Sequence, residues 1–317
     1  MIAIHLQGGD VEIRKSSTPK RAKGYALLRL RLGGICNTDL ELQRGYYGFR
    51  GRPGHEFVAD VVEADSTEWV GKRVVGEINL ACQKCDWCHR GLQRHCPHRT
   101  VLGIVKHPGA FAQFLTLPEK NLHSVPRAMR DERAVFTEPV AAACEILDQV
   151  KISNETEVAV LGDGKLGLLI SQTLAAHGAK VHQFGKHREK LRIAERAGVT
   201  GEVARRLFPV SRYGVVVDAT GSSSGLEQAI RMTQPRGTVV CKSTVHDQVQ
   251  IDMAPVIVNE ISLVGSRCGR FEPALRLLAT QKIHTDEMID SRFPLSRGDA
   301  AFARAAERGA LKVLLEA

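Results

Sequence analysis

The sequence has few aromatic residues and no long apolar run. Phe, Trp and Tyr make up 5% of its 317 residues, and apolar stretches such as residues 158–161 and 215–217 are far shorter than the roughly 20 residues of a membrane-spanning helix. The first residues lack the basic segment and the apolar run of a secretory signal. We therefore expect no membrane partner and a cytoplasmic location.

Charge of one sign is not concentrated in any part of the chain. The net charge is +9, but the longest basic groupings, residues 14–23 and 186–192, are not interleaved with aromatic residues that could stack on nucleobases. We therefore expect no nucleic-acid partner. Attraction of an anionic cofactor explains the positive charge better. The length and the hydrophobic content of 43% predict a folded chain of two domains.

The eight cysteines do not suggest a disulfide framework, because cytosolic thiols are kept reduced. Four of them follow the spacing Cys-x2-Cys-x2-Cys-x7-Cys, at Cys82, Cys85, Cys88 and Cys96. The short gaps let consecutive thiolates converge on one ion, and the longer gap lets the chain return to complete a tetrahedron. Four thiolates leave no room for water, so this spacing predicts a structural zinc. The alternative is a loop of four reduced thiols.

A second possible metal set comes from separated segments: Cys36, His55 and Glu138, with Glu56 beside His55. A thiolate, an imidazole and a carboxylate are typical ligands of a catalytic zinc whose fourth position stays open for water or a substrate oxygen. Each residue alone has a simpler explanation, as a buried thiol, a hydrogen-bonded imidazole or a helix-capping carboxylate. Their combination with the cysteine loop favours the zinc site.

Two neighbours of Cys36 have natural roles in such a site. The Thr38 hydroxyl could lie beside the substrate oxygen and pass its proton outward, and the Asp39 carboxylate could accept the second ring N–H of His55. The alternative for this segment is helix capping by Asn37 or Thr38. Both interpretations can hold together.

Residues 155–184 read as a strand, a glycine turn, a helix and a second strand. The turn is Gly162-x-Gly164-x-x-Gly167, and it follows a β-branched run. In such a unit the backbone N–H groups at the start of the helix hold a pyrophosphate. The expected contacts include Lys165 and Leu166 beside the three glycines. Later alternation of Val-rich runs and helical patterns predicts a parallel sheet covered on both faces.

The end of the second strand bears on the choice of cofactor. An NAD site places Asp or Glu there to bond the ribose 2′-OH, whereas a 2′-phosphate needs that carboxylate absent and cations nearby. This chain has Gly185 at that position, followed by Lys186 and, two residues later, Arg188. Glycine makes room and the cations can bind phosphate, which favours NADP(H). Alternatively, the two cations begin a solvated helix, with Glu189 close to them.

These motifs occur in the order seen in medium-chain zinc-dependent alcohol dehydrogenases, which the chain resembles from about Gly24 onward. The resemblance implies a GroES-like β-barrel catalytic domain over residues 1–138, a Rossmann domain with a doubly wound parallel sheet over 139–284, and a C-terminal return to the catalytic domain over 285–317. It also implies that Cys36, His55 and Glu138 are the catalytic zinc ligands, that Glu56 is an alternating ligand, and that Thr38 starts a proton relay.

A glutamate at position 138 resembles the polyol, sorbitol and threonine dehydrogenase branch, which points to a secondary alcohol. We expect an oxidoreductase with two zinc ions that moves a hydride between an alcohol or carbonyl compound and NAD(P). Two alternatives are a non-catalytic zinc- and nucleotide-binding sensor or structural protein, and a zinc-independent reductase of activated alkenes. By the same resemblance we expect a homodimer or homotetramer, paired through the strand at residues 261–265.

Overall fold

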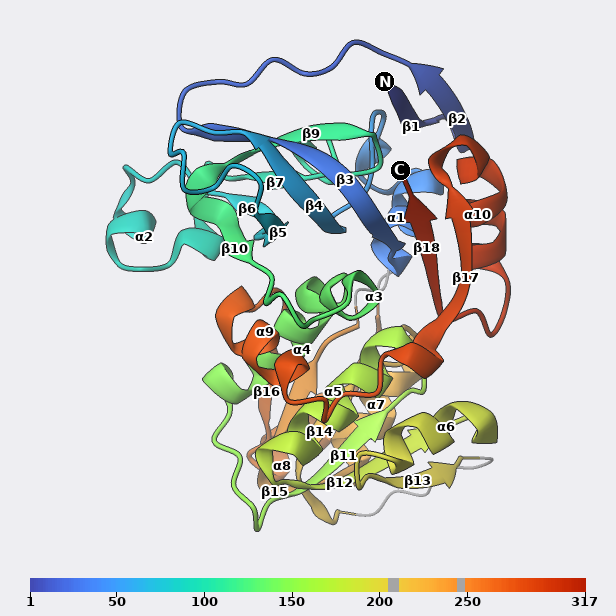
Figure 1. The fold of residues 1–317 in the computed structure, drawn as a ribbon. Coiled ribbons are helices and arrows are strands. Elements are labelled where there is room, and N and C mark those ends of the chain that lie inside the picture. Colours follow the sequence, from blue (N-terminus) through green and yellow to red (C-terminus); the bar gives the residue numbers. More distant parts are fainter. Residues whose placement is uncertain (205–210, 244–248) are drawn as a thin grey trace. The chain divides into compact units, whose positions relative to one another are not determined.

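The computed structural model describes residues 1–204, 211–243 and 249–317, which divide into two compact units (Figure 1). Unit 1 consists of residues 1–138 and 289–317, and unit 2 of residues 139–288. The boundary between them falls inside helix α4 (Thr137–Gln149). Among the described residues, no helix combines the length and the apolar character needed to cross a membrane.

Unit 1 is organised around a sheet of seven strands. The strand order is β10-β5-β4-β3-β18-β17, and β9 also pairs with β3. The strands are β3 (Tyr25–Ile35), β4 (Glu56–Glu63), β5 (Arg73–Gly76), β9 (Phe114–Pro118), β10 (Leu122–Ser124), β17 (Ile289–Pro294) and β18 (Lys312–Glu316). Strand β18 runs antiparallel to β3, with Val313 opposite Ile35. Strand β18, from the end of the described residues, therefore lies between β3 and the edge strand β17 in a sheet built mostly from early residues.

Smaller elements surround this sheet. The other strands are β1 (Ile2–Gln7), β2 (Asp10–Lys15), β6 (Asn79–Leu80), β7 (Thr100–Leu102) and β8 (Lys106–His107). The helices are α1 (Asn37–Gln43), α2 (Asp86–His89), α3 (Asp131–Ala134) and α10 (Gly298–Ala306), with short 3-10 turns η1 (Tyr46–Gly48), η2 (Gln93–His95), η3 (Glu119–Asn121) and η5 (Leu295–Arg297).

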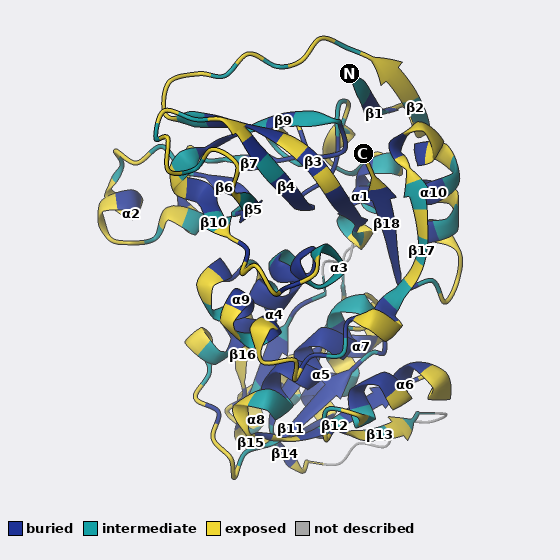
Figure 2. Cartoon of the chain, in the orientation of Figure 1, coloured by how far each residue is buried: buried dark blue, intermediate teal, exposed yellow. Residues whose placement is uncertain are grey.

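Buried and exposed residues alternate along part of β3 (Figure 2). Leu30 and Leu32 are buried, while Arg29 and Arg31 are exposed. This alternation is typical of a sheet with one face packed on the core.

Unit 2 contains a six-stranded parallel sheet in the order β13-β12-β11-β14-β15-β16. Its strands are β11 (Glu157–Leu161), β12 (Lys180–Gly185), β13 (Thr200–Val203), β14 (Tyr213–Asp218), β15 (Thr233–Cys241) and β16 (Ser262–Gly265). Its helices besides α4 are α5 (Lys165–His177), α6 (Arg188–Glu195), α7 (Ser223–Met232), α8 (Ala254–Val258), α9 (Phe271–Ala279) and the turn η4 (Asp286–Met288). Numbered within the unit, the order is 3-2-1-4-5-6, that of doubly wound dinucleotide-binding sheets. The predicted parallel sheet is confirmed.

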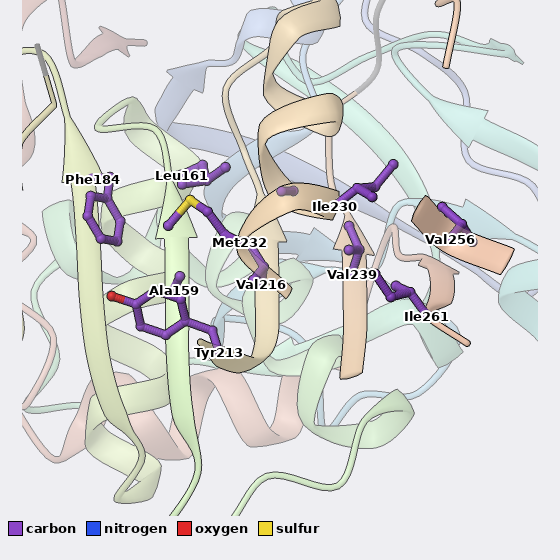
Figure 3. Close-up of a cluster of buried hydrophobic side chains, with 11 residues drawn as sticks. Ala159, Leu161, Phe184, Tyr213, Val216, Ile230, Met232, Val239, Val256 and Ile261 are labelled. Atoms are coloured by element: carbon purple, nitrogen blue, oxygen red, sulfur yellow. The ribbon is translucent and has the colours of Figure 1, made fainter. Parts of the chain in front are cut away.

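The core of unit 2 explains its Val-rich runs. Strand residues including Leu161, Val216 and Val239 pack against Ile230 of α7 and Val256 of α8 in one buried cluster (Figure 3). The remaining buried members are Ala159, Phe184, Tyr213, Ala229, Met232 and Ile261. Consecutive valines point to opposite faces of a strand, so a run of them stays buried only when both faces of the sheet are covered.

Candidate metal centres and nucleotide site

The four clustered cysteines come together around α2 and η2 in unit 1. Their sulfur atoms are separated by 4.0 Å (Cys82–Cys88), 3.6 Å (Cys85–Cys88), 3.7 Å (Cys85–Cys96) and 3.5 Å (Cys82–Cys96). A tetrahedron with Zn–S bonds of about 2.3 Å has edges of about 3.8 Å, so these spacings fit one zinc ion. All four are free thiols, and Cys96 is fully buried.

Hydrogen bonds and burial shift the pKa values of two thiols in this cluster. The backbone N–H of Lys84 lowers the pKa of Cys82 to about 6, so its thiolate is the main form at neutral pH. Zinc binds thiolates, not thiols. The backbone N–H of Cys88 lowers the pKa of Cys85, but burial and the hydrogen bonds among the neighbouring thiols outweigh it and raise that pKa to about 11. The cluster therefore has the spacing that a structural zinc requires, and zinc binding would displace the remaining thiol protons.

A second cluster lies where β3 and β4 run side by side. Cys36 directly follows β3 and forms the N-cap of α1, while His55 directly precedes Glu56, the first residue of β4. The antiparallel register places Gly34 opposite Glu56, which brings the end of one strand to the start of the other. One ligand atom each from Cys36, His55 and Glu56 lie within 4.8 Å of one another. Soft thiolate, imidazole and carboxylate together match an open zinc site.

The buried Asp39 carboxylate ties the two strands of this cluster together. Its Oδ2 atom accepts a hydrogen bond of 2.9 Å from the backbone N–H of Cys36, and its Oδ1 atom accepts one of 3.1 Å from the N–H of Gly54. The Oδ1 atom also lies 3.4 Å from Nδ1 of His55, close enough for a charge interaction but outside hydrogen-bonding geometry. Burial lowers the pKa of His55, but Asp39 and Cys36 outweigh burial and raise the pKa well above its ordinary value. The N-cap of α1 is Cys36, so the alternative of capping by Asn37 or Thr38 is wrong.

A lysine that the motifs do not indicate completes the cluster. The Lys312 side chain on β18 is 1% exposed, and its ammonium group directly contacts the Glu56 carboxylate, which is fully buried. Burial lowers the pKa of Lys312, but Glu56 and then Cys36 and Glu138 raise it above its ordinary value, so the lysine stays charged. A Cβ atom at position 34 would lie 2.6 Å from the Glu56 carboxylate, and glycine there gives the pair its space.

The remaining predicted residues of this cluster lie as follows. Glu138 is in the first turn of α4 and is not among the three residues whose ligand atoms converge, so the carboxylate gathered with Cys36 and His55 is that of Glu56. The Thr38 hydroxyl lies 3.9 Å from the Cys36 sulfur. Phe111, whose ring would meet a Cβ atom at Gly54, has no exposed surface and packs edge-on against Phe302.

The glycine turn of unit 2 has the geometry of a phosphate-binding loop. Gly162 has φ +107°, and a Cβ atom there would lie 2.6 Å from the carbonyl oxygen of Ala219. Gly164, the N-cap of α5, has no atom within 4 Å of its Cβ position, so another molecule can approach the backbone closely. A Cβ atom at Gly167 would lie 2.3 Å from the Gly162 carbonyl oxygen, so glycine lets α5 pack against the turn. These are the three separate roles of glycine in dinucleotide-binding loops. Lys165 and Leu166 occupy the first turn of α5, where backbone N–H groups point out of the helix.

The end of β12 differs from the sequence-based expectation in one respect. The space at Gly185 is filled by Asp163, whose Cβ atom would lie 2.5 Å from a Cβ atom at 185. Arg188 pairs with Glu195 at 2.6 and 3.0 Å, so its charge is already partnered, while the exposed Lys186 has no ion pair with any described residue. The expectation that glycine leaves room here is therefore wrong, because the glycine loop itself supplies the side chain that fills it.

Comparisons with known proteins agree with this architecture. The alcohol dehydrogenase GroES-like domain matches residues 22–127, and the zinc-binding dehydrogenase domain matches residues 166–280. Sorbitol dehydrogenase of Halalkalibacterium halodurans is 27% identical over 97% of this chain and 96% of its own length, and D-altritol 5-dehydrogenase of Agrobacterium fabrum is 30% identical over 86% of each. A solved zinc-binding dehydrogenase from Sinorhizobium meliloti 1021, bound to NADP, has a TM-score of 0.91 and 27% identity, over 100% of this chain and 99% of the other.

A GroES-like domain joined to a Rossmann-type zinc-binding dehydrogenase domain defines an oxidoreductase that acts on alcohols with NAD(P). More particularly, the chain belongs to the zinc-dependent medium-chain alcohol dehydrogenase family, in the branch of sorbitol, arabitol and threonine dehydrogenases. The fold class and the family expected from the sequence are both confirmed.

Replacing Cys88 by serine should remove one zinc ion per chain, because a hydroxyl is a far weaker zinc ligand than a thiolate. Zinc content measured by mass spectrometry of the purified protein checks this, with the thermal midpoint expected to fall as well. Cys144→Ser, outside both clusters, is the control and should keep the wild-type zinc content. An unchanged zinc content in Cys88→Ser would refute the four-cysteine site.

Replacing Lys312 by methionine should destabilise the protein by about 3–5 kcal/mol, because it leaves the Glu56 charge buried and unpaired. Urea denaturation measures the change. The double variant Lys312→Met/Glu56→Gln removes both charges and should recover much of the loss, and Lys120→Met, at an exposed lysine, should stay within about 0.5 kcal/mol of wild type. Equal effects of Lys312→Met and Lys120→Met would contradict the buried pair.

Proposed function

We propose that this chain transfers a hydride between a secondary, polyol-like alcohol and NADP(H), in preference to NAD(H), and carries one catalytic and one structural zinc ion. The convergence of Cys36, His55 and Glu56 carries the proposal, because it supplies three ligands of different chemistry in one partly buried place. The names of the relatives, which include sorbitol, erythritol/L-threitol and D-arabitol-phosphate dehydrogenases, support a polyol-like substrate.

The residues of unit 1 would hold the catalytic zinc and handle the proton. Cys36, His55 and a carboxylate, either Glu56 or Glu138, are the proposed ligands. Zinc bound there would supply a Lewis acid that lowers the pKa of an alcohol. Asp39 fixes the position of Cys36 and His55 through its buried contacts, and Lys312 compensates the negative charge of Glu56. The Thr38 hydroxyl would accept the alcohol proton and pass it outward, a role that its distance of 3.9 Å from the Cys36 sulfur supports.

Unit 2 would hold the cofactor. The three glycines and the first turn of α5, with Lys165 and Leu166, are proposed to receive the pyrophosphate. The proposed preference for NADP(H) rests on the absence of Asp or Glu from the end of β12 itself and on the exposed Lys186 side chain nearby, a cation with no ion pair to a described residue. The Asp163 carboxylate, which fills the space beside Gly185, acts against it. Arg188 could contribute only by leaving Glu195.

Replacing Cys36 by alanine should abolish turnover of a secondary-alcohol panel and remove one zinc ion per chain. NADPH binding, followed by its fluorescence, should be unchanged, because the glycine loop is untouched. The matched control is Cys144→Ala, which should keep activity. Full activity in Cys36→Ala would refute the mechanism.

The wild-type protein distinguishes the two alternative functions. Binding of two zinc ions without turnover of any alcohol or carbonyl compound would favour the non-catalytic sensor. Activity that survives zinc removal would favour the zinc-independent reductase.

We also propose a cytoplasmic homodimer or homotetramer. Strand β16 is an edge of the parallel sheet, and an unpaired edge invites association. Three apolar side chains on α8 and β16 are exposed: Ile257 (71%), Val258 (79%) and Leu263 (37%). Sedimentation of Val258→Lys/Leu263→Lys should show a smaller species than wild type, and a monomeric wild type would refute the proposal.

A further inference from the structure

The Asp163 carboxylate gathers three hydrogen-bond donors at the end of β12. It belongs to the glycine turn, between Gly162 and Gly164, and its side chain is only 10% exposed. One oxygen, Oδ2, accepts hydrogen bonds from the backbone N–H of Lys186 at 2.8 Å and of His187 at 2.6 Å. The ring of His187 lies against the same oxygen, with Nδ1 at 2.9 Å. These donors form a small anion-binding site that the protein's own side chain occupies.

The position of this carboxylate matters because of where a dinucleotide would lie. In a doubly wound sheet the residue at the end of the second strand meets the 2′ position of the adenosine ribose. Here that residue is Gly185, and a Cβ atom on it would lie 2.7 Å from Oδ2 of Asp163. The strand has no carboxylate at its end, but the Asp163 carboxylate from the glycine turn occupies the same space.

The two nicotinamide cofactors would meet this carboxylate differently. The three contacts of the carboxylate all use Oδ2, so a ribose 2′-OH can donate a hydrogen bond to its second oxygen, Oδ1. A 2′-phosphate carries about two negative charges, would be repelled by the carboxylate and would seek the same backbone N–H donors. The cost is large because the carboxylate is nearly buried, where charges are poorly screened.

We propose that Asp163 reduces the preference for NADP(H) over NAD(H), by opposing the 2′-phosphate and competing with it for the backbone N–H groups of Lys186 and His187. This rests on the proposed function, since it assumes that the glycine turn receives a dinucleotide. Gly185 and Lys186 favour the phosphate, and Asp163 limits how far that preference extends.

The test is fluorescence titration with NADPH and with NADH, each on wild type and on two variants. In Asp163→Asn the charge is lost but the amide oxygen can still accept the backbone N–H bonds. We expect NADPH to bind at least tenfold more tightly, about 1.4 kcal/mol, while NADH binding changes by less than about threefold. Asp163→Ser, which keeps a shorter acceptor, should show the same direction and serves if the first variant does not fold.

The control is Glu189→Gln, which removes an equal charge from an exposed side chain in the first turn of α6. It should leave the ratio of the two affinities within about threefold of wild type. An unchanged ratio in both Asp163 variants, or an equal change in Glu189→Gln, overturns the inference. The wild-type titrations test the proposed function separately. If the wild-type protein binds neither cofactor, both the proposed function and the inference fail. If NADPH binds weakly to the wild type and tightly only to the Asp163 variants, the proposed NADP preference is wrong but the inference about Asp163 holds.

Discussion

Two carboxylates in unit 1, Asp39 and Glu56, are almost entirely withdrawn from water, and the arrangement of the cluster around Cys36 and His55 follows from the need to compensate them. An uncompensated buried charge is too costly to keep, so each must meet donors or a cation. Asp39 receives backbone N–H groups from two segments and faces His55, and Glu56 meets Lys312. These contacts fix three separate parts of the chain in one place. A metal ion would enter a site that is already charged and positioned.

The features that could be predicted from the sequence are those whose geometry is local. Cys82 to Cys96 lie within one short loop, and Gly162 to Gly167 within one turn, so spacing alone constrains where their atoms can go. The Val-rich runs of unit 2 likewise predict a parallel sheet without knowledge of its neighbours. Spacing alone could not show that Cys36 and His55 lie together. Their approach depends on the pairing of β3 with β4, and spacing along the chain does not specify the register of two strands.

Lys312 and Asp163 could not be found in this way. Lys312 lies 256 residues from Glu56 in the sequence, and only the pairing of β18 with β3 brings it to the cluster. A lysine followed by three apolar residues in the strand Lys312–Glu316 was a signal, but it indicates burial of a charge without identifying its partner. Asp163 turns toward β12 because donors there attract it, and this filled the space that glycine at 185 had suggested was open.

The place of β18 in the sheet has a consequence for biosynthesis. Unit 2 is one continuous stretch, so its residues can all be present while later codons are still being translated, and domains generally fold as units during synthesis. Unit 1 is interrupted by it, and neither strand β18 nor the Lys312 cation that neutralises Glu56 exists until residues 312–316 emerge from the ribosome. The first part of unit 1 therefore lacks strands β17 and β18, and its Glu56 carboxylate stays uncompensated, until the whole of unit 2 has been synthesised.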